Sequence, residues 1–174
     1  MKTSLVITTA IAALLIPGAA SAKKHNFVIT AVEGSREATG AEEKPEDNNS
    51  TNKATFAATL DDDKKTLCVK YELKSGDAAK PFEGTLAHIH KVYKEKGDGT
   101  GPAVVDLETA KFTGAKGPKS IDVTDDLETL TGGDDLYFNV HSEAFPDGEV
   151  RGTLEVDEAA EEVVCDEEIG RASC

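Results

Sequence analysis

Apolar and polar residues alternate along several short stretches of this chain, and the clearest of them runs from Leu136 to Leu154. In LYFNVH (136–141) the apolar Leu, Phe and Val alternate with Tyr, Asn and His. This two-residue period is typical of a β-strand with two different faces. Pro146-Asp147-Gly148 then has the composition of a turn, because proline fixes φ and glycine accepts a positive φ. Alternation resumes at Val150. The pattern predicts a β-hairpin whose polar residues gather at one end.

The same alternation predicts a series of short strands before this hairpin. They cover residues 27–32, 54–60, 67–73, 86–93 and 103–107, with a shorter one at 121–123. At residues 127–135 the sequence predicts a turn or a short helix that ends at Gly132-Gly133. No internal repeat and no long helical period interrupts this order. The sequence therefore predicts an all-β fold, a single antiparallel, Greek-key-like β-sandwich with an acidic C-terminal tail.

The two ends of the chain differ from this middle part. Residues 1–22 contain the basic Lys2, an apolar stretch and an Ala20-Ser21-Ala22 cleavage motif, which together are typical of a secretory signal peptide. The apolar stretch is too short to span a bilayer, and no later segment is apolar enough to do so. We expect a β-sandwich domain at 23–156, secreted or, in a bacterium, periplasmic. An acidic, loosely held tail with cysteines should follow at 157–174.

The chain is strongly acidic, with a formal net charge of −14. Because Lys and Arg carry most phosphate binding, this balance argues against nucleic acid and anionic membrane surfaces as partners. It is compatible with cationic partners, including divalent metal ions. Solubility alone accounts for such a charge in many secreted proteins, so the acidity selects no partner.

Three cysteines are present, Cys68, Cys165 and Cys174. In an oxidising compartment at least two of them should pair. We expect a bridge between Cys165 and Cys174, which closes a short loop, because Cys68 lies in the middle of a strand and can serve as a small core residue. A bridge from Cys68 to either of the other two remains the alternative.

The polar stretch 33–53 is typical of a long loop and contains two overlapping N-x-S/T sequons. They make Asn48 and Asn49 glycosylation candidates if the source is eukaryotic. In a bacterium the same pattern carries no meaning, and the sequence does not indicate which of the two applies.

Three of the four histidines, His88, His90 and His141, lie in two of the predicted strands. Residues i and i+2 of a strand share a face, roughly 6.6 Å apart. Two imidazoles at that spacing, joined by a third from a neighbouring strand, form a set that suits copper or zinc and leaves a position open. The alternative is that these histidines are buried structural groups, hydrogen-bonded to backbone or carboxylate. The parity of 86–93 does not decide which face His88 and His90 occupy.

Glu149 and Arg151 lie on one face of the second hairpin strand. A structural ion pair or a cross-strand contact is the simpler interpretation. A position in the outer shell of a metal site, with the arginine guiding an anion, is the alternative.

Three segments together resemble the CHRD domain, first described in the chordin family and also found in secreted bacterial and fungal proteins. They are Ala87-His88-Ile89-His90, GPAVVDL (101–107) and LYFNVH (136–141) followed by Gly148-Glu149-Val150-Arg151-Gly152. The resemblance covers roughly residues 27–156 and implies a compact antiparallel β-sandwich, but little about activity. A fainter likeness is to Cu/Zn superoxide dismutases, which also carry a His-x-His strand, a later strand histidine and an arginine. The bridging histidine and zinc loop of those enzymes are missing, so at most a single-metal site is implied.

Two hypotheses about function follow. In the first, the protein is a secreted, non-catalytic CHRD module that binds an unknown extracellular protein or has a structural role. In the second, it is a mononuclear copper or zinc protein with dismutase-like chemistry at His88, His90 and His141. Bound metal in the purified protein separates the two.

Overall fold

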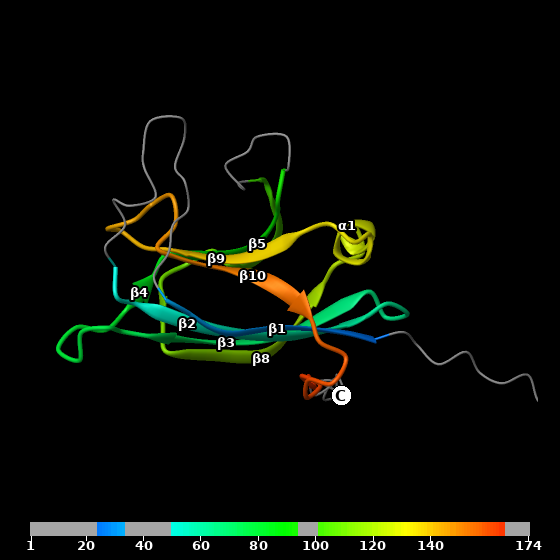
Figure 1. Cartoon of the computed structure of the whole chain (residues 1–174), viewed down its shortest axis with the longest axis horizontal. Coiled ribbons are helices and arrows are strands. Elements are labelled where there is room, and N and C mark those ends of the chain that lie inside the picture. Colours follow the sequence, from blue (N-terminus) through cyan, green and yellow to red (C-terminus); the bar gives the residue numbers. More distant parts are fainter. Residues whose placement is uncertain (1–23, 34–49, 94–100, 166–174) are drawn as a thin grey trace, which may run out of the picture.

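A computed structural model of the chain describes residues 24–33, 50–93 and 101–165 (Figure 1). Almost all regular structure in these ranges is β-strand, and no helix there is long and apolar enough to cross a membrane. The elements, in chain order, are β1 (Lys24–Glu33), β2 (Lys53–Asp61), β3 (Thr66–Lys74), β4 (Glu83–Gly84), β5 (Leu86–Lys91), β6 (Ala103–Glu108), β7 (Phe112–Thr113), β8 (Ala115–Asp122), α1 (Leu127–Thr131), β9 (Leu136–His141) and β10 (Val150–Val156).

Eight strands form one antiparallel sheet that folds back on itself into two layers (Figure 1). Their order is β6-β5-β9-β10-β1-β2-β3-β8, while β4 and β7 pair separately. Strand β10 joins the layers, because Val150 to Leu154 pair with β9 whereas Glu155 and Val156 pair with β1. Several neighbours in space, such as β5 and β9, are not neighbours in sequence, as in a Greek-key arrangement. The predicted all-β, antiparallel fold is confirmed.

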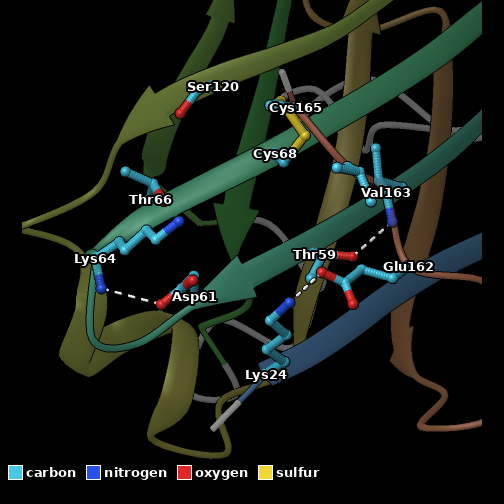
Figure 2. A pocket seen from close by; sticks show the side chains of 11 residues that line it. Lys24, Thr59, Asp61, Lys64, Thr66, Cys68, Ser120, Glu162, Val163 and Cys165 are labelled. Carbon is cyan, nitrogen blue, oxygen red and sulfur yellow. Dashed lines mark hydrogen bonds and ion pairs between the residues drawn. A yellow bond between two sulfur atoms is a disulfide. The ribbon is translucent and has the colours of Figure 1, made fainter. Parts of the chain in front are cut away.

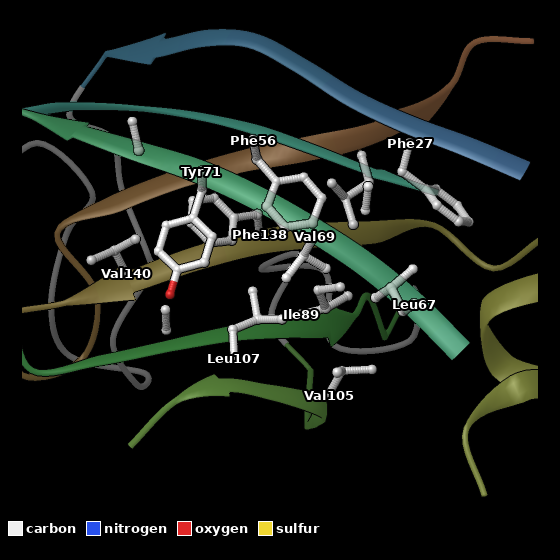
Figure 3. Close-up of a cluster of buried hydrophobic side chains, with 14 of the residues drawn as sticks. Phe27, Phe56, Leu67, Val69, Tyr71, Ile89, Val105, Leu107, Phe138 and Val140 are labelled. Carbon is white, nitrogen blue, oxygen red and sulfur yellow. The ribbon is translucent and has the colours of Figure 1, made fainter. Parts of the chain in front are cut away.

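The core lies between the two layers and is built from the inward side of each strand (Figure 3). Aromatic rings cross it: the Phe56 and Phe138 centroids are 4.9 Å apart, and those of Tyr71 and Phe138 are 5.7 Å apart. Each fully buried large apolar side chain contributes about 1.5–3 kcal/mol to folding. The alternation read from the sequence thus places one face of β2, β3, β5 and β9 in a single core.

The predicted hairpin at 136–154 is confirmed as β9 and β10. Val150 pairs with Val140 and Leu154 with Leu136, so the two arms are in register along their whole shared length. Gly148 has a φ of +134°, which a residue with a side chain rarely adopts. The glycine of the predicted turn is therefore needed where the chain reverses.

The two end strands of the sheet, β6 and β8, are joined by side chains. Tyr71 donates a hydrogen bond to Glu108 Oε1 (2.8 Å), and Lys119 Nζ lies 2.8 Å from the same oxygen. Lys119 also donates to the Leu107 carbonyl. We call Tyr71, Glu108 and Lys119 the edge network. It connects the two end strands by side chains. In a closed barrel these strands would be joined by backbone hydrogen bonds.

Most of β8 was not predicted from the sequence, which indicated a strand only at 121–123. Its sequence, AKGPKSID, contains a glycine and a proline and lacks apolar alternation. Both are tolerated because β8 is an end strand and has a β-bulge opposite Val69. At Gly117 the φ is +86°, and a Cβ atom would lie 2.3 Å from the Val69 carbonyl oxygen. Local signals for a strand are consequently weak there.

The segment after β10 is bound to the outer surface of the sheet, contrary to the expectation of a loosely held tail. Asp157 donates from its backbone to Asn26 O (2.9 Å), and Asn26 Nδ2 donates to Ala160 O (3.1 Å). The Val163 amide donates to Thr59 Oγ1 (2.8 Å), and the Val163 side chain is buried. Residues 157–165 therefore form an ordered strap across β1 and β2; residues 166–174 lie outside the described ranges.

A disulfide joins Cys68 to Cys165 and fixes the end of this strap to β3 (Figure 2). The expected Cys165–Cys174 bridge is therefore wrong, as is a core position for Cys68, whose side chain faces the strap. The strap reaches β3 because it crosses β1 and β2 first, and it leaves the two Cα atoms 5.7 Å apart. The 97 residues between the cysteines hide this proximity from the sequence.

Candidate metal site

The pairing of β5 with β9 determines which face of the sheet carries the histidines. Ile89 of β5 pairs with Phe138 of β9, and both side chains are buried in the core. His88 and His90, on either side of Ile89, therefore lie on the opposite face. His141 joins them there, because it is three residues beyond Phe138 and so has the opposite parity. All three predicted ligands come together on the outer face of β5 and β9.

The three rings are close enough to share one ion. One ring nitrogen from each histidine lies within 4.8 Å of the other two. The closest pair, His88 Nδ1 and His141 Nε2, is 3.3 Å apart. Two nitrogens bound tetrahedrally to a metal at about 2.0–2.1 Å are about 3.3–3.4 Å apart. That pair already has the required separation, and the other separations exceed it by no more than about 1.5 Å.

Two of the rings are held by backbone carbonyl groups behind them. His90 Nδ1 lies 2.9 Å from the Gly101 carbonyl oxygen, and His141 Nδ1 lies 2.8 Å from that of Pro146. A carbonyl oxygen only accepts hydrogen bonds, so each Nδ1 carries the proton and each neutral ring has its lone pair on Nε2. The Nε2 of His141 lies toward His88 Nδ1, and one nitrogen of His90 lies within 4.8 Å of both partners.

The third ring has a carboxylate behind it. His88 Nε2 is 3.5 Å from Asp106 Oδ1 on β6, and the Asp106 side chain is exposed. The other ring nitrogen, Nδ1, is the one that faces His141. Every histidine of the cluster thus has one nitrogen toward the common space and an oxygen acceptor at the other. Imidazoles that bind metals are usually oriented by such acceptors.

The nitrogen of His90 that faces the cluster has no hydrogen-bond partner among the described residues. The His90 side chain is almost fully buried, at 8% exposure, and its Nε2 is inaccessible to solvent. Leaving a buried acceptor unpaired costs about 1–3 kcal/mol. At His141 the corresponding nitrogen accepts from Asn139 Nδ2 at 3.2 Å. The Nε2 of His90 thus lacks the hydrogen bond that the Nε2 of His141 has.

The electrostatic surroundings favour the neutral, metal-binding form of two rings. Burial lowers the pKa of His88 from its ordinary value, and the neighbouring His141 and His90 lower it further. Burial likewise lowers the pKa of His90, more than its hydrogen bond to Gly101 raises it. Metal binding requires deprotonated ligands. Two of the three candidate ligands are therefore favoured in the neutral form that metal binding needs.

Glu149 and Arg151 have different contacts. Glu149 is buried, and its Oε1 accepts hydrogen bonds from Ser50 Oγ (2.5 Å) and Asn52 Nδ2 (2.6 Å), which ties the 50–52 segment to the hairpin. The Arg151 guanidinium carbon lies 3.7 Å from the centre of the Tyr137 ring. Glu149 therefore supports the hairpin, while Arg151 lies one ring away from the histidines.

Several residues that shape the site escaped the sequence analysis. Tyr137 stacks on His90 with ring centres 4.7 Å apart and planes 11° from parallel. Asp106 and the carbonyls of Gly101 and Pro146 orient the three imidazoles. Gly101 and Asp106 belong to the GPAVVDL segment that carries the family resemblance, and this was the only signal for them.

Three further predictions fall on residues outside the described ranges. They are the signal peptide at 1–22, the glycosylation candidates Asn48 and Asn49, and the role of Cys174. They stay predictions from the sequence.

These features define a small, two-layered antiparallel β-domain, joined to its C-terminal strap by a disulfide and carrying three histidines on the outer face of one layer. Residues 35–154 match the CHRD domain, which is more than half of the chain. The protein belongs to the CHRD domain family. The match includes all three histidines, Gly101 and Asp106, whereas β1 precedes it. No curated protein and no solved structure matches the chain.

Proposed function

We propose that this CHRD protein works outside the cytoplasm as a binding module whose ligand is a single copper or zinc ion, held by His88, His90 and His141. One observation carries the proposal. Three imidazole nitrogens face one space, while the opposite nitrogen of each ring is directed at an oxygen acceptor. The disulfide is consistent with an oxidising compartment.

The competing interpretation is that the histidines only stabilise the fold. A structural histidine normally uses both nitrogens in hydrogen bonds, because buried polar groups are nearly always paired. Here His90 uses only Nδ1, and its buried Nε2 has no hydrogen-bond partner among the described residues. A buried lone pair beside two further imidazoles attracts a cation. The arrangement thus costs stability in the empty protein and is useful when an ion is bound.

The donor set restricts the metal. Three neutral imidazoles suit copper and zinc, and an open fourth position is typical of sites where a further ligand can bind. For a given nitrogen site, Cu(II) binds more tightly than Zn(II). We expect both ions to bind at a ratio of one per chain, with copper the tighter of the two.

Metal titration of the purified protein tests the proposal. Metal-free protein, processed at its own cleavage site, is titrated by calorimetry with Zn(II) and with Cu(II), and bound metal is counted by elemental analysis. For zinc, the proposal predicts one ion per chain for the natural sequence and none for His90→Ala. For copper it predicts the same in a His25→Ala background, because a histidine third from a free amino terminus binds Cu(II) by itself. His25→Ala is the matched control, because it removes the only histidine outside the cluster. The absence of saturable binding in the natural protein, or equal binding by His90→Ala, would reject the metal site.

A second candidate function is superoxide dismutation by bound copper. Arg151 favours it, since the cation lies against Tyr137, which itself stacks on His90. A positive charge at that position would attract an anion towards the open side of the site. The reaction converts two superoxide ions and two protons into O2 and H2O2. The copper-loaded protein should then inhibit cytochrome c reduction by superoxide, and Arg151→Ala should inhibit it less. Inactivity of the loaded protein rejects this candidate and leaves metal binding in place.

A further inference from the structure

We infer that Gly101 is a positioning residue for His90: its carbonyl group holds the imidazole in the tautomer with a proton on Nδ1 and a free Nε2. The inference rests on the proposed function for its consequence, a higher metal affinity. The tautomer itself is a property of the metal-free protein. Gly101, His90 and Tyr137 together make the arrangement, which we call the Gly101 triad.

The three members of the triad contact one another in a closed set. His90 Nδ1 donates to the Gly101 carbonyl (2.9 Å), and the Gly101 amide donates to the Tyr137 hydroxyl oxygen (3.3 Å). The Tyr137 ring in turn stacks on His90 at 4.7 Å. One aromatic side chain thus fixes both the plane of the imidazole and the position of the backbone group that orients it.

Only glycine can bring a carbonyl group to this position. A Cβ atom on residue 101 would lie 1.6 Å from the Lys91 carbonyl oxygen, far inside any possible contact. The next residue also packs against β5, since the Lys91 amide donates to the Pro102 carbonyl (3.2 Å). Residues 101–102 therefore lie backbone against backbone on the strand that carries His90. A side chain at 101 would push the carbonyl away from the ring.

The tautomer decides whether His90 can bind an ion without rearrangement. A neutral imidazole has one proton, and a proton on Nε2 would occupy the nitrogen that faces the cluster. Because the carbonyl can only accept, it selects the Nδ1 proton and leaves Nε2 open. Loss of such an outer-shell partner typically lowers metal affinity by about 10–100-fold. We expect a loss of that size when the Gly101 carbonyl is displaced.

The first test uses the metal-free protein and needs no metal binding at all. Long-range 1H–15N correlation spectra of 15N-labelled protein, recorded above the pH at which the rings protonate, distinguish the two imidazole tautomers. His90 should show a protonated Nδ1 and an unprotonated Nε2. Dominance of the Nε2–H tautomer would overturn the inference. This result stands whether or not the protein binds metal, so failure here and failure of the proposed function are distinguishable.

The second test disturbs the triad and measures both tautomer and affinity. Gly101→Ala should reduce the Nδ1–H population and weaken zinc binding about 10–100-fold. Tyr137→Phe keeps the stacked ring, removes the acceptor of the Gly101 amide, and should give a smaller change in the same direction. It also keeps the test decisive if Gly101→Ala does not fold. An unchanged His90 tautomer in both variants contradicts the role of Gly101.

A control separates positioning from general loss of stability. Gly114 has a φ of +65° and open space around its Cβ position, so Gly114→Ala strains the backbone away from the histidines. It should lower the melting temperature while leaving the His90 tautomer and zinc affinity unchanged. A loss of affinity in Gly114→Ala equal to that in Gly101→Ala would show that instability alone weakens the site, and would overturn the inference.

Discussion

Two groups of largely buried polar side chains, the edge network and the histidine cluster, are organised in opposite ways. In the edge network, Tyr71 and Lys119 both donate to one carboxylate, so donors meet an acceptor and opposite charges meet each other. In the histidine cluster, like groups face each other, and the lone pair of His90 has no partner among the described residues. The first arrangement pairs its polar groups with one another, whereas the second includes a buried lone pair that a cation would pair.

The pairing of polar groups therefore distinguishes groups that stabilise the fold from groups that are suited to bind a ligand. Paired groups lower the free energy of the folded state, and removal of one member leaves another unpaired. Groups that repel or stay unpaired raise that energy and persist where a ligand uses them. Variants of the edge network should therefore lose stability and keep metal binding. Variants of the cluster should lose metal binding whatever their effect on stability.

Removal of a histidine should give the largest effect. Replacing His90 by Ala deletes one ligand of three, and zinc affinity should fall by more than the roughly 100-fold that an outer-shell change can cause. The metal-free protein should also lose some stability, because the ring packs on Tyr137 and donates to Gly101, although the unpaired nitrogen is lost with it. Calorimetric titration and urea unfolding of the same preparation measure the two quantities. Strong destabilisation with intact binding would reverse the comparison.

Metal-linked stabilisation should be the next largest effect. An ion present at 100 times its dissociation constant raises the free energy of unfolding by about 2.7 kcal/mol, which for a domain of this size is roughly 5–15 °C in melting temperature. The shift should vanish in His141→Ala and after addition of EDTA. Glu108→Ala should start from a lower melting temperature and show the same shift. A metal-induced shift that persists without His141 would place the ion elsewhere.

The edge network should give a moderate effect on stability alone. Glu108→Ala leaves the Tyr71 hydroxyl and the Lys119 ammonium without their shared acceptor, which should lower the free energy of unfolding by about 1–3 kcal/mol. Because Tyr71 is buried, Tyr71→Phe is the matched control: it removes the donor together with its need for a partner and should cost less. Chemical denaturation measures both. Equal stability of Glu108→Ala and the natural protein would show that the network does not join the end strands.

The two regions also differ in how far the sequence predicts them. Apolar alternation predicted β9, β10 and the candidate ligands, because a two-residue period can be read locally. It left the face of His88 and His90 open, since apolar residues occur at both parities of β5; the pairing of Ile89 with Phe138 decided it. The edge network was not predicted at all. Lys119 lies in β8, where Gly117 and Pro118 interrupt the sequence pattern of a strand. Its partner, Glu108, lies in β6 at the opposite end of the sheet.

Long-range proximity limits sequence analysis in the same way at the disulfide. The short Cys165–Cys174 separation favoured a local bridge, while the observed partner Cys68 is reached only after the strap has crossed two strands. The carbonyl groups that contact the histidines could not be predicted either. Every residue has a carbonyl group, and only the fold determines which one lies next to an imidazole ring. Residue types therefore predicted which histidines come together, and the geometry that orients them had to come from the structure.

A change of pH should produce the smallest effect and separates the two regions by their charge. Burial alone would raise the pKa of Glu108, but the hydrogen bonds from Lys119 and Tyr71 outweigh it and lower the pKa below its ordinary value of 4.5. A carboxyl whose pKa is lower in the folded protein stabilises the fold fully above 4.5, and this contribution is lost as the pH falls through the folded-state pKa.

The natural protein and Glu108→Gln provide the measurement, because acid effects elsewhere in the chain are common to both. Their difference in free energy of unfolding should be constant between pH 6 and 8 and should shrink below about pH 4.5, where the glutamate of the unfolded chain takes up its proton first. A parallel comparison with Gly114→Ala should show no such narrowing, since that variant changes no titratable group. If the Glu108→Gln difference stays constant down to pH 3, Glu108 gains nothing from its charge in the folded state, and the contrast between a charge-paired network and a cation-binding cluster fails.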